Sequence, residues 1–208
     1  MNDKIFYERL TPENAAVAMI DHQTGLLVNC RDMDATVMKT NIIALCNMAK
    51  VLDLPSVVTA SAPDGQNGPL MPEITKILDG KVIERKGEIN AWDAPEFREA
   101  IEKTGRKKII MAGIVTDVCL MFPAISAVAE GYDVYAVIDA SGTWNKTVQE
   151  AAMLRMTQAC IKVSTWASVL AEIMVDWRSP KGMELGQILG EHLSYGWVNN
   201  SFFASNSK

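Results

Sequence analysis

Nearly continuous apolar runs alternate with amphipathic stretches along most of this chain. The run at 15–21, AAVAMID, has the length and composition of a strand buried on both faces of a parallel sheet. Residues 35–53 instead place apolar side chains three and four positions apart, which predicts a helix with one apolar face. Because this alternation continues to about residue 178, we expect strands connected by covering helices.

The remaining elements follow from the same two patterns. Strands are expected at 55–61, 81–85, 107–114, 133–141 and 161–165, and helices at 94–105, 117–130, 147–160 and 166–177. Asp93 is expected to cap the helix that Gly105 ends, and Gly131 to end the next helix. This order indicates one α/β domain, a parallel sheet with helices on both faces and right-handed crossovers.

Residues 179–208 differ in character from the rest of the chain. They are rich in aromatic residues, glycine, serine and asparagine. We therefore predict one domain, 1–178, and a C-terminal tail, 179–208, that packs on the core or on a neighbouring subunit. Trp197, Phe202 and Phe203 favour such packing, and a loosely ordered terminus is the alternative.

Composition narrows the class of protein. The 208 residues are 49% hydrophobic and 22% charged, which is typical of a globular domain. The net charge is -5 and no cluster of lysine or arginine stands out, so a nucleic-acid partner is not expected. No apolar run reaches the roughly 18 residues of a membrane span, and the first residues lack a signal-peptide pattern. We expect no membrane association and a cytoplasmic location.

Cysteine and histidine spacing gives no indication of a metal site. Four cysteines occur without a CxxC pair, and His22 and His192 are far apart. Zinc-ligand spacing is therefore absent, and free thiols in a reducing compartment are expected. The GxGxxG and GxxxxGK[ST] nucleotide motifs are also missing. We predict no metal and no cofactor.

Four residues with reactive or charged side chains follow predicted strands. The first strand ends at Asp21, the third at Arg85 and Lys86, and the fourth leads into Cys119. Ligands of open parallel sheets bind beyond the carboxyl ends of the strands, so these residues are expected at one edge. Each also has an ordinary interpretation: a turn aspartate, solvated cations and a core cysteine.

Together, an acid, a cation and a thiol suit acyl transfer through a thioester. A helix N-terminus and a nearby lysine would lower the pKa of the thiol from about 8.5. A carboxylate can take the thiol proton and return it to a leaving group. Backbone N–H groups of the turn 113–119 could stabilise an oxyanion. From spacing alone, the catalytic and structural interpretations both stay open.

A signal more specific for one protein family comes from three segments, AAVAMIDHQTGLL, INAWD and GIVTDVC. They resemble the isochorismatase-like cysteine hydrolase superfamily, and within it the YcaC-type hydrolases of unassigned specificity. The similarity extends from about residue 10 to 180. It implies an α/β fold of Rossmann-like type, a three-layer αβα sandwich with a six-stranded parallel sheet.

The resemblance also implies a catalytic triad of Asp21, Lys86 and Cys119. Arg85, beside Lys86, could share or replace the role of the lysine. A cis peptide bond is implied between Ile114 and Val115, and an oxyanion hole formed by the N–H groups of Val115 and Cys119. The candidate substrate-binding residues are Gln23, Arg85, Asn90, Trp92 and Trp144.

Two departures from relatives narrow the expected activity. The stretch SAPDGQNGPL has no histidine, whereas nicotinamidases of the superfamily carry a metal motif there. Isochorismatases themselves typically lack the nucleophilic cysteine that Cys119 represents. We therefore predict a metal-free hydrolase that cleaves an amide or related acyl C–N bond of a small molecule. The resemblance implies a homo-oligomer, with a ring-built octamer as one candidate.

Two other hypotheses stay open from the sequence. The first is a vinyl-ether or imine hydrolase without covalent catalysis, in which the Cys119→Ala variant keeps its activity. The second is a thiol-based redox sensor, in which Cys119 reacts but no acyl substrate is turned over.

Overall fold

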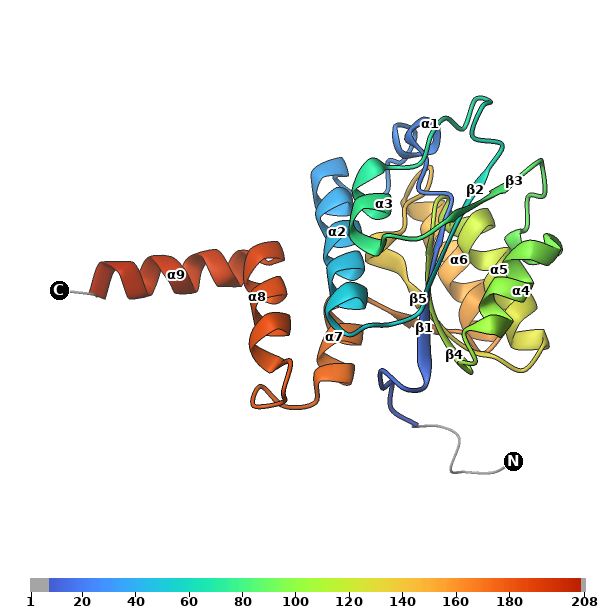
Figure 1. The fold of residues 1–208 in the computed structure, drawn as a ribbon. Coiled ribbons are helices and arrows are strands. Elements are labelled where there is room, and N and C mark those ends of the chain that lie inside the picture. The colour runs from blue at the N-terminus through green and yellow to red at the C-terminus, as the bar shows by residue number, and fades with distance from the viewer. Residues whose placement is uncertain (1–7, 207–208) are drawn as a thin grey trace.

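A six-stranded, all-parallel sheet forms the centre of the computed structural model, which describes residues 8–206 (Figure 1). The strands are β1 (Ala15–Ile20), β2 (Ser56–Ser61), β3 (Val82–Arg85), β4 (Lys108–Gly113), β5 (Asp133–Val137) and β6 (Lys162–Ser164). Their order in the sheet is β3-β2-β1-β4-β5-β6, and every neighbouring pair is parallel. The predicted fold class is confirmed.

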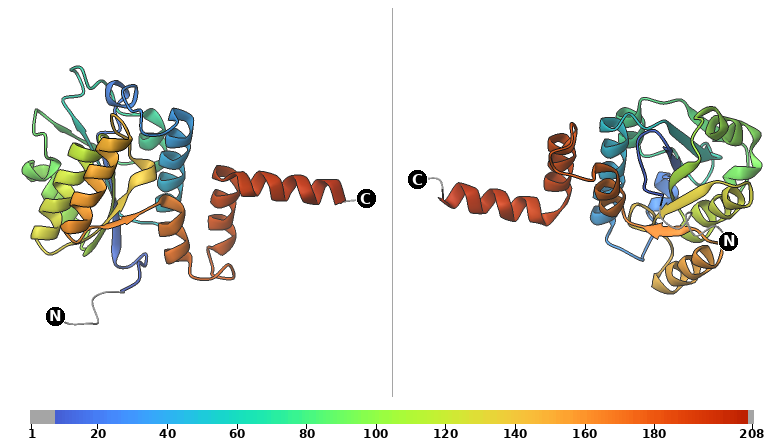
Figure 2. Two further views of the ribbon diagram at one scale, coloured as in Figure 1. Left: turned by 180° about the vertical axis from the view of Figure 1, so that it is seen from behind. Right: turned by 90° about the horizontal axis from the view of Figure 1, so that it is seen from below.

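Helices cover both faces of this sheet (Figures 1 and 2). One face packs against α2 (Ala35–Val51), α3 (Pro72–Leu78) and α7 (Trp166–Met174), with α8 (Gly182–His192) on α2. The other face packs against α4 (Pro95–Lys103), α5 (Met121–Ala129) and α6 (Lys146–Gln158). The shorter elements are α1 (Thr24–Leu27), η2 (Ala91–Asp93), η3 (Thr116–Leu120) and η4 (Ile138–Ala140).

The apolar run at β1 is explained by burial on both faces. Val17 and Met19 belong to the apolar cluster under α2 and α7, whereas Ala18 and Ile20 belong to the cluster under α4, α5 and α6. Successive side chains of a strand point to opposite faces, so a central strand between two helix layers needs apolar residues at every position.

Several predicted element ends differ from the structure. Asp93 lies in η2 and makes no cap, because Ala94 is the N-cap residue of α4. The helix expected from 117 begins as the π-helical turn η3 before α5. Gly105 and Gly131 have φ angles of +67° and +85° after α4 and α5, as expected of glycines that end helices.

The C-terminal residues form two helices, α8 and α9 (Ser194–Asn206). Leu185, Ile188 and Leu189 of α8 are part of the core, whereas α9 projects away from the rest of the molecule in every view (Figures 1 and 2). The packing of α8 agrees with a tail that packs on the core, and the division into a domain and a tail stays a prediction. The side chains of Phe202 and Phe203 lie outside the described part.

The strand order places a switch point at the centre of the sheet. The chain continues from β1 toward β2 on one side, and from β4 toward β5 on the other. At such a point the loops after the two strands separate and leave a crevice at the carboxyl edge, which is where open α/β sheets bind ligands. Among residues 8–206, no helix has both the length and the apolar composition to cross a membrane.

Candidate active site

Three of the sequence-predicted residues meet at the switch point. Asp21 follows β1, Cys119 lies in η3 after β4, and Arg85 is the last residue of β3. Asp21 is fully buried, Arg85 is 3% exposed and Cys119 is 8% exposed. The structure therefore brings an acid, a cation and a thiol together in a nearly closed environment.

The Arg85 guanidinium is bound on all sides. Its Nη2 donates to both carboxylate oxygens of Asp21, and its Nε donates to Thr59 Oγ1 at 3.1 Å. Its Nη1 donates to the carbonyl oxygens of Glu88 and Ile89. The stability of the fold depends on such a buried ion pair, because removal of either partner leaves an uncompensated buried charge.

Lys86 does not occupy this position. It is exposed, and within residues 8–206 no ion pair joins it to Asp21. Arg85 is the last residue of β3 and pairs with Asp21, whereas Lys86 lies after the end of the strand. Of the two candidate cations that the sequence left open, the one beside Asp21 in the structure is Arg85, whose donors are used by protein atoms.

The Cys119 thiol hydrogen-bonds the Asp21 carboxylate. Burial raises the pKa of Cys119 above its ordinary value, and the neighbouring Asp21 charge raises it further. A backbone hydrogen bond from Val115 and the charge of Arg85 oppose that shift. The expectation of a lowered thiol pKa is therefore wrong, because the sulfur is buried beside an anion.

Asp21 is placed to act as a base toward that thiol. Burial raises the pKa of its carboxyl, and Arg85 opposes the shift. A carboxylate with a raised pKa accepts a proton more readily than one in water. Because the pKa of the thiol is raised, its proton is favoured on sulfur, and the adjacent carboxylate is the group that can accept it.

The turn before Cys119 has the backbone geometry that the resemblance implied. The Ile114–Val115 peptide bond is cis. The N–H of Cys119 donates to the Val115 carbonyl at 2.8 Å, and that of Thr116 donates to the Gly142 carbonyl at 2.9 Å. The oxyanion-hole roles of Val115 and Cys119 stay predictions. In this structure the N–H of Cys119 is already used for the hydrogen bond to the Val115 carbonyl.

Gln23 has a different environment from the one expected of a substrate-binding residue. It is fully buried, and its Nε2 donates to the carbonyls of Ser61 at 3.0 Å and Gly68 at 2.7 Å. Its Oε1 accepts the Ser61 N–H at 2.9 Å. Since both amide hydrogens are used, Gln23 holds the 61–68 loop against the end of β1 and has no hydrogen left for a ligand.

The other three candidate substrate-binding residues, Asn90, Trp92 and Trp144, differ in their hydrogen bonds and in their exposure. Asn90 accepts the Trp92 N–H at 3.0 Å and donates to Ser126 at 3.1 Å. Trp92 is buried in the same apolar cluster as Cys119, and its indole N–H donates to Glu130 at 2.8 Å. Trp144 is 42% exposed. Of the three, Trp144 has the most accessible side chain for contact with a ligand.

A buried polar network behind the site was not anticipated. Asp32, 3% exposed, accepts the Thr143 N–H at 2.9 Å and the Gln149 side-chain amide at 2.8 Å. The Thr143 hydroxyl donates to Asp117 at 2.6 Å, two residues before the nucleophile candidate. This network connects the η3 turn to the loop that carries Trp144. Its partners are more than 25 residues apart in sequence, so no local pattern indicates it.

His22, beside Asp21, is a neutral buried residue. Its Nε2 lies 2.9 Å from the Ala140 carbonyl, and its Nδ1 has no partner among the described residues. Burial lowers the pKa of His22 to about 4. In the described part of the chain, no three His, Cys, Asp or Glu side chains form a group that could hold a metal ion.

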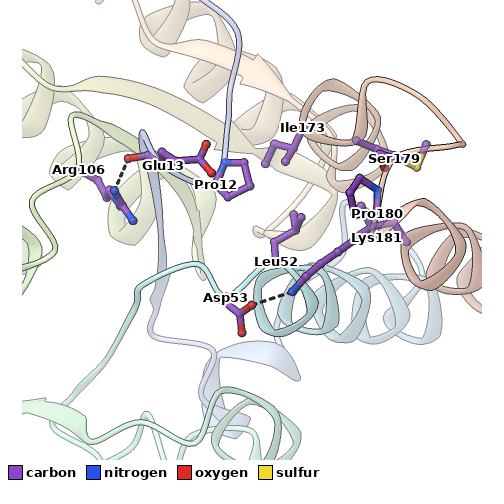
Figure 3. Close-up of a pocket in the computed structure, with 11 residues that line it drawn as sticks. Pro12, Glu13, Leu52, Asp53, Arg106, Ile173, Ser179, Pro180 and Lys181 are labelled. Carbon is purple, nitrogen blue, oxygen red and sulfur yellow. Dashed lines mark hydrogen bonds and ion pairs between the residues drawn. The ribbon is translucent and has the colours of Figure 1, made fainter.

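The cavity in Figure 3 lies at the opposite edge of the sheet. It measures about 550 Å³, and its walls include Glu13, Asp53, Arg106 and Lys181, which precede strands or belong to the α7–α8 connection. Lys181 binds Asp53 at 2.7 Å, and Arg106 donates to the Glu13 carbonyl. Strands of six residues span about 20 Å, so this cavity is separate from the site around Cys119.

Comparison with known proteins adds to this geometry. A family model for the isochorismatase domain matches residues 15–168, which is more than half of the chain. The probable hydrolase YcaC of Escherichia coli strain K12 is 45% identical over 174 residues. That similarity covers 83% of this chain and 84% of the relative.

Two solved structures are similar over nearly the whole chain. YcaC from Pseudomonas aeruginosa, with hexane-2,5-diol and covalent acrylamide, has a TM-score of 0.91 and 45% identity, covering 95% of this chain and 98% of that one. The YcaC gene product of Escherichia coli, described as an octameric hydrolase of unknown specificity, has a TM-score of 0.92 and 42% identity, covering 96% and 98%. These findings confirm the resemblance inferred from the motifs.

Proposed function

Because this chain belongs to the isochorismatase family of hydrolases, we propose that it cleaves an amide or related acyl C–N bond of a small molecule through a thioester on Cys119. The observation that carries the proposal is the hydrogen bond between the Cys119 thiol and the Asp21 carboxylate, beside Arg85. A thiol that already donates to a carboxylate has a base in place for its proton.

In the first half of the proposed reaction, Asp21 takes the thiol proton while the sulfur of Cys119 attacks the acyl carbon. Backbone N–H groups stabilise the resulting oxyanion, and that of Val115 is the first candidate because Val115 hydrogen-bonds the thiol. The N–H of Cys119 is the second, and it would have to leave the Val115 carbonyl. The C–N bond then breaks, and Asp21 gives its proton to the leaving nitrogen.

In the second half, water attacks the thioester carbon while Asp21 takes a proton from the water. The sulfur of Cys119 leaves and regains a proton from Asp21, so the products are a carboxylic acid and the free thiol. Arg85 keeps the carboxylate in position and balances its charge in a buried site, which is the role that the resemblance gives to Lys86.

Acrylamide bound covalently in a relative supports the proposal that the Cys119 thiol is reactive. YcaC from Pseudomonas aeruginosa, 45% identical to this chain, was solved with covalent acrylamide. Acrylamide is an electrophile that cysteine thiolates add to, and thiolates are the nucleophilic form of cysteine. We propose that Cys119 is the residue of this chain that forms such an adduct, and that Trp144, Asn90 and Trp92 lie beside the bound ligand.

The proposed enzyme is a homo-oligomer in the cytoplasm. The octameric YcaC of Escherichia coli, with a TM-score of 0.92, supports the assembly. The four cysteines are free, which fits a reducing compartment.

The proposal is tested by trapping the acyl-enzyme. The chain is mixed with a panel of small primary amides and with p-nitrophenyl acetate, quenched in acid and measured by intact-protein mass spectrometry. We expect an acyl adduct on Cys119, and turnover that is lost in Cys119→Ala. The matched control is Cys160→Ala, since Cys160 is the exposed free cysteine and is expected to have no effect.

Two outcomes would contradict the thioester mechanism. Turnover that survives in Cys119→Ala favours the non-covalent vinyl-ether or imine hydrolase. An acrylamide adduct on Cys119 without turnover of any acyl substrate favours the thiol sensor.

A further inference from the structure

The π-helical turn η3, which carries the candidate nucleophile, is attached to the buried segment 141–143. The N–H of Thr116 donates to the Gly142 carbonyl at 2.9 Å. The hydroxyl of Thr143 donates to the carboxylate of Asp117 at 2.6 Å. The first two residues of the turn are therefore held from outside, one through the backbone and the other through its side chain.

The hydrogen bonds inside η3 do not determine its shape by themselves. One carbonyl oxygen, that of Val115, accepts the N–H groups of three residues at 2.8–3.2 Å, Val118, Cys119 and Leu120. Three donors that share one acceptor leave the turn free to change between similar hydrogen-bond patterns. π-helical turns are rare and are frequent at functional sites. The position of the Cys119 sulfur therefore depends on the contacts that η3 makes with the segment 141–143.

Thr143 is itself fixed by hydrogen bonds on both sides of its backbone. Its N–H donates to Asp32 at 2.9 Å, and its carbonyl accepts the N–H of Arg31 at 2.8 Å. The second carboxylate oxygen of Asp32 accepts the Gln149 amide at 2.8 Å. Both donors to this buried carboxylate are neutral groups, and burial of a charge solvated in this way is costly. Stability alone therefore does not account for Asp32.

The neighbouring Gly142 shows how closely this segment is packed. A Cβ added there would lie 2.6 Å from Met38 Cε of α2 and 3.0 Å from the sulfur of Cys30. No larger residue fits at position 142 unless these side chains or the backbone move. The segment 141–143 is thus a tightly packed support on which η3 rests.

We infer that Thr143, held in place by Asp32, is a positioning residue that acts through Asp117 to keep the Cys119 thiol on the Asp21 carboxylate. The inference rests on the proposed thioester chemistry, in which Asp21 takes the thiol proton as the sulfur attacks. Without the Thr143 hydroxyl, Asp117 is released and the turn can move the sulfur away from its base. A misplacement of about 1 Å at a reacting centre can cost about 10²-fold in rate.

The test measures acylation of Cys119 by p-nitrophenyl acetate in the full-length protein, from p-nitrophenolate release and intact-protein mass. Thr143→Val keeps the size of the side chain and removes the hydroxyl, whereas Thr143→Ser keeps the hydroxyl and removes a methyl group. Asp117→Ala removes the acceptor of the same hydrogen bond, and the double variant with Thr143→Val completes a double-mutant cycle. Thr104→Val is the control, since that hydroxyl donates to the Ile101 carbonyl at 2.7 Å before β4, at the opposite edge of the sheet.

We expect Thr143→Val and Asp117→Ala each to slow acylation at saturating ester by about 10–100-fold, with KM within about threefold of the parent. The double variant should lose no more than either single variant, because both changes remove one hydrogen bond. Thr143→Ser and Thr104→Val should stay within about threefold of the parent rate. Urea unfolding checks that each variant is folded, and Asp117→Ala decides the comparison if Thr143→Val does not fold.

Three outcomes overturn the positioning role alone. They are a parent-like rate in the folded variants that lack the hydrogen bond, a Thr143→Ser variant as slow as Thr143→Val, and a raised KM at an unchanged maximal rate. Losses that multiply in the double variant also overturn it, since the two residues would then act separately. A parent that p-nitrophenyl acetate does not acylate on Cys119 overturns the proposed chemistry and the inference with it.

Discussion

Arg85 donates hydrogen bonds to both carboxylate oxygens of Asp21, a residue 64 positions earlier in the chain. Both side chains are almost completely buried. The pair joins the last residue of β3 to the end of β1, with the Thr59 hydroxyl of β2 between them. It therefore fixes the base of the candidate site across three neighbouring strands.

The two adjacent cations should respond differently to substitution. Arg85→Met leaves Asp21 as a buried carboxylate without a partner, which is expected to lower the free energy of unfolding by about 3–5 kcal/mol. Lys86→Met changes an exposed side chain and is expected to stay within about 0.5 kcal/mol of the parent. Urea unfolding of the three proteins measures this difference. Equal losses in the two variants would mean that Arg85 is not the structural partner of Asp21.

Removal of the Asp21 charge should make the thiol easier to ionise. The Asp21 carboxylate raises the pKa of Cys119, so Asp21→Asn is expected to lower it while burial still acts in the opposite direction. Acrylamide labelling of Cys119 should then begin at lower pH in the variant, although turnover is lost with the base. Mass spectrometry across a pH series follows this, with exposed Cys160 as the internal control. An unchanged or higher labelling pH contradicts the proposed pair.

His22 should make the fold sensitive to acid. Its pKa is about 4 in the folded protein against an ordinary 6.5, so the unfolded chain binds a proton first as the pH falls. The stability that His22 contributes is complete above pH 6.5 and is lost toward pH 4, an effect of about 3 kcal/mol.

The comparison for this prediction is His22→Gln, which keeps an N–H donor for the Ala140 carbonyl. Urea midpoints from pH 7 to pH 4 should fall less steeply in the variant than in the parent. Parallel slopes would show that His22 does not titrate differently in the folded and unfolded states.

Gln23 is expected to behave as a loop anchor. Gln23→Met keeps the size of the side chain but removes three hydrogen bonds to Ser61 and Gly68, with an expected cost of about 1–3 kcal/mol. Hydrogen exchange at the Ser61 amide should become faster, because its acceptor is lost. Gln66→Met, exposed in the same loop, is the control and should change neither measurement. A stable Gln23→Met variant with unchanged exchange would restore a ligand-binding role as the simpler interpretation.

The fold could be predicted from the sequence because the central strands β1 and β4 are buried apolar runs and helices such as α2 and α7 bury an apolar face. The positions of Asp21 and Cys119 could be predicted as well, since Asp21 comes directly after one such run and Cys119 lies in the turn that follows another. The identity of the cation did not follow, because the end of β3 decides which of two adjacent residues faces Asp21, and strand ends are poorly defined by pattern.

Other features depend on contacts between distant residues. Gln23 pairs with a loop about 40 residues away, and Asp32 pairs with Gln149 at a separation of 117. The raised pKa of Cys119 depends on burial and on the Asp21 charge, which no local pattern contains. The π-helical turn η3 also replaced the regular helix start that the apolar periodicity predicted.

The position of the candidate site at the β1–β4 boundary has a consequence for protein synthesis. Asp21 and Arg85 belong to the half of the sheet that leaves the ribosome first, whereas Cys119 arrives with the second half. A nascent chain can form the ion pair before it possesses the thiol. Cys119 is thus encoded after both members of the ion pair, and the candidate site is complete only when β4 has paired with β1.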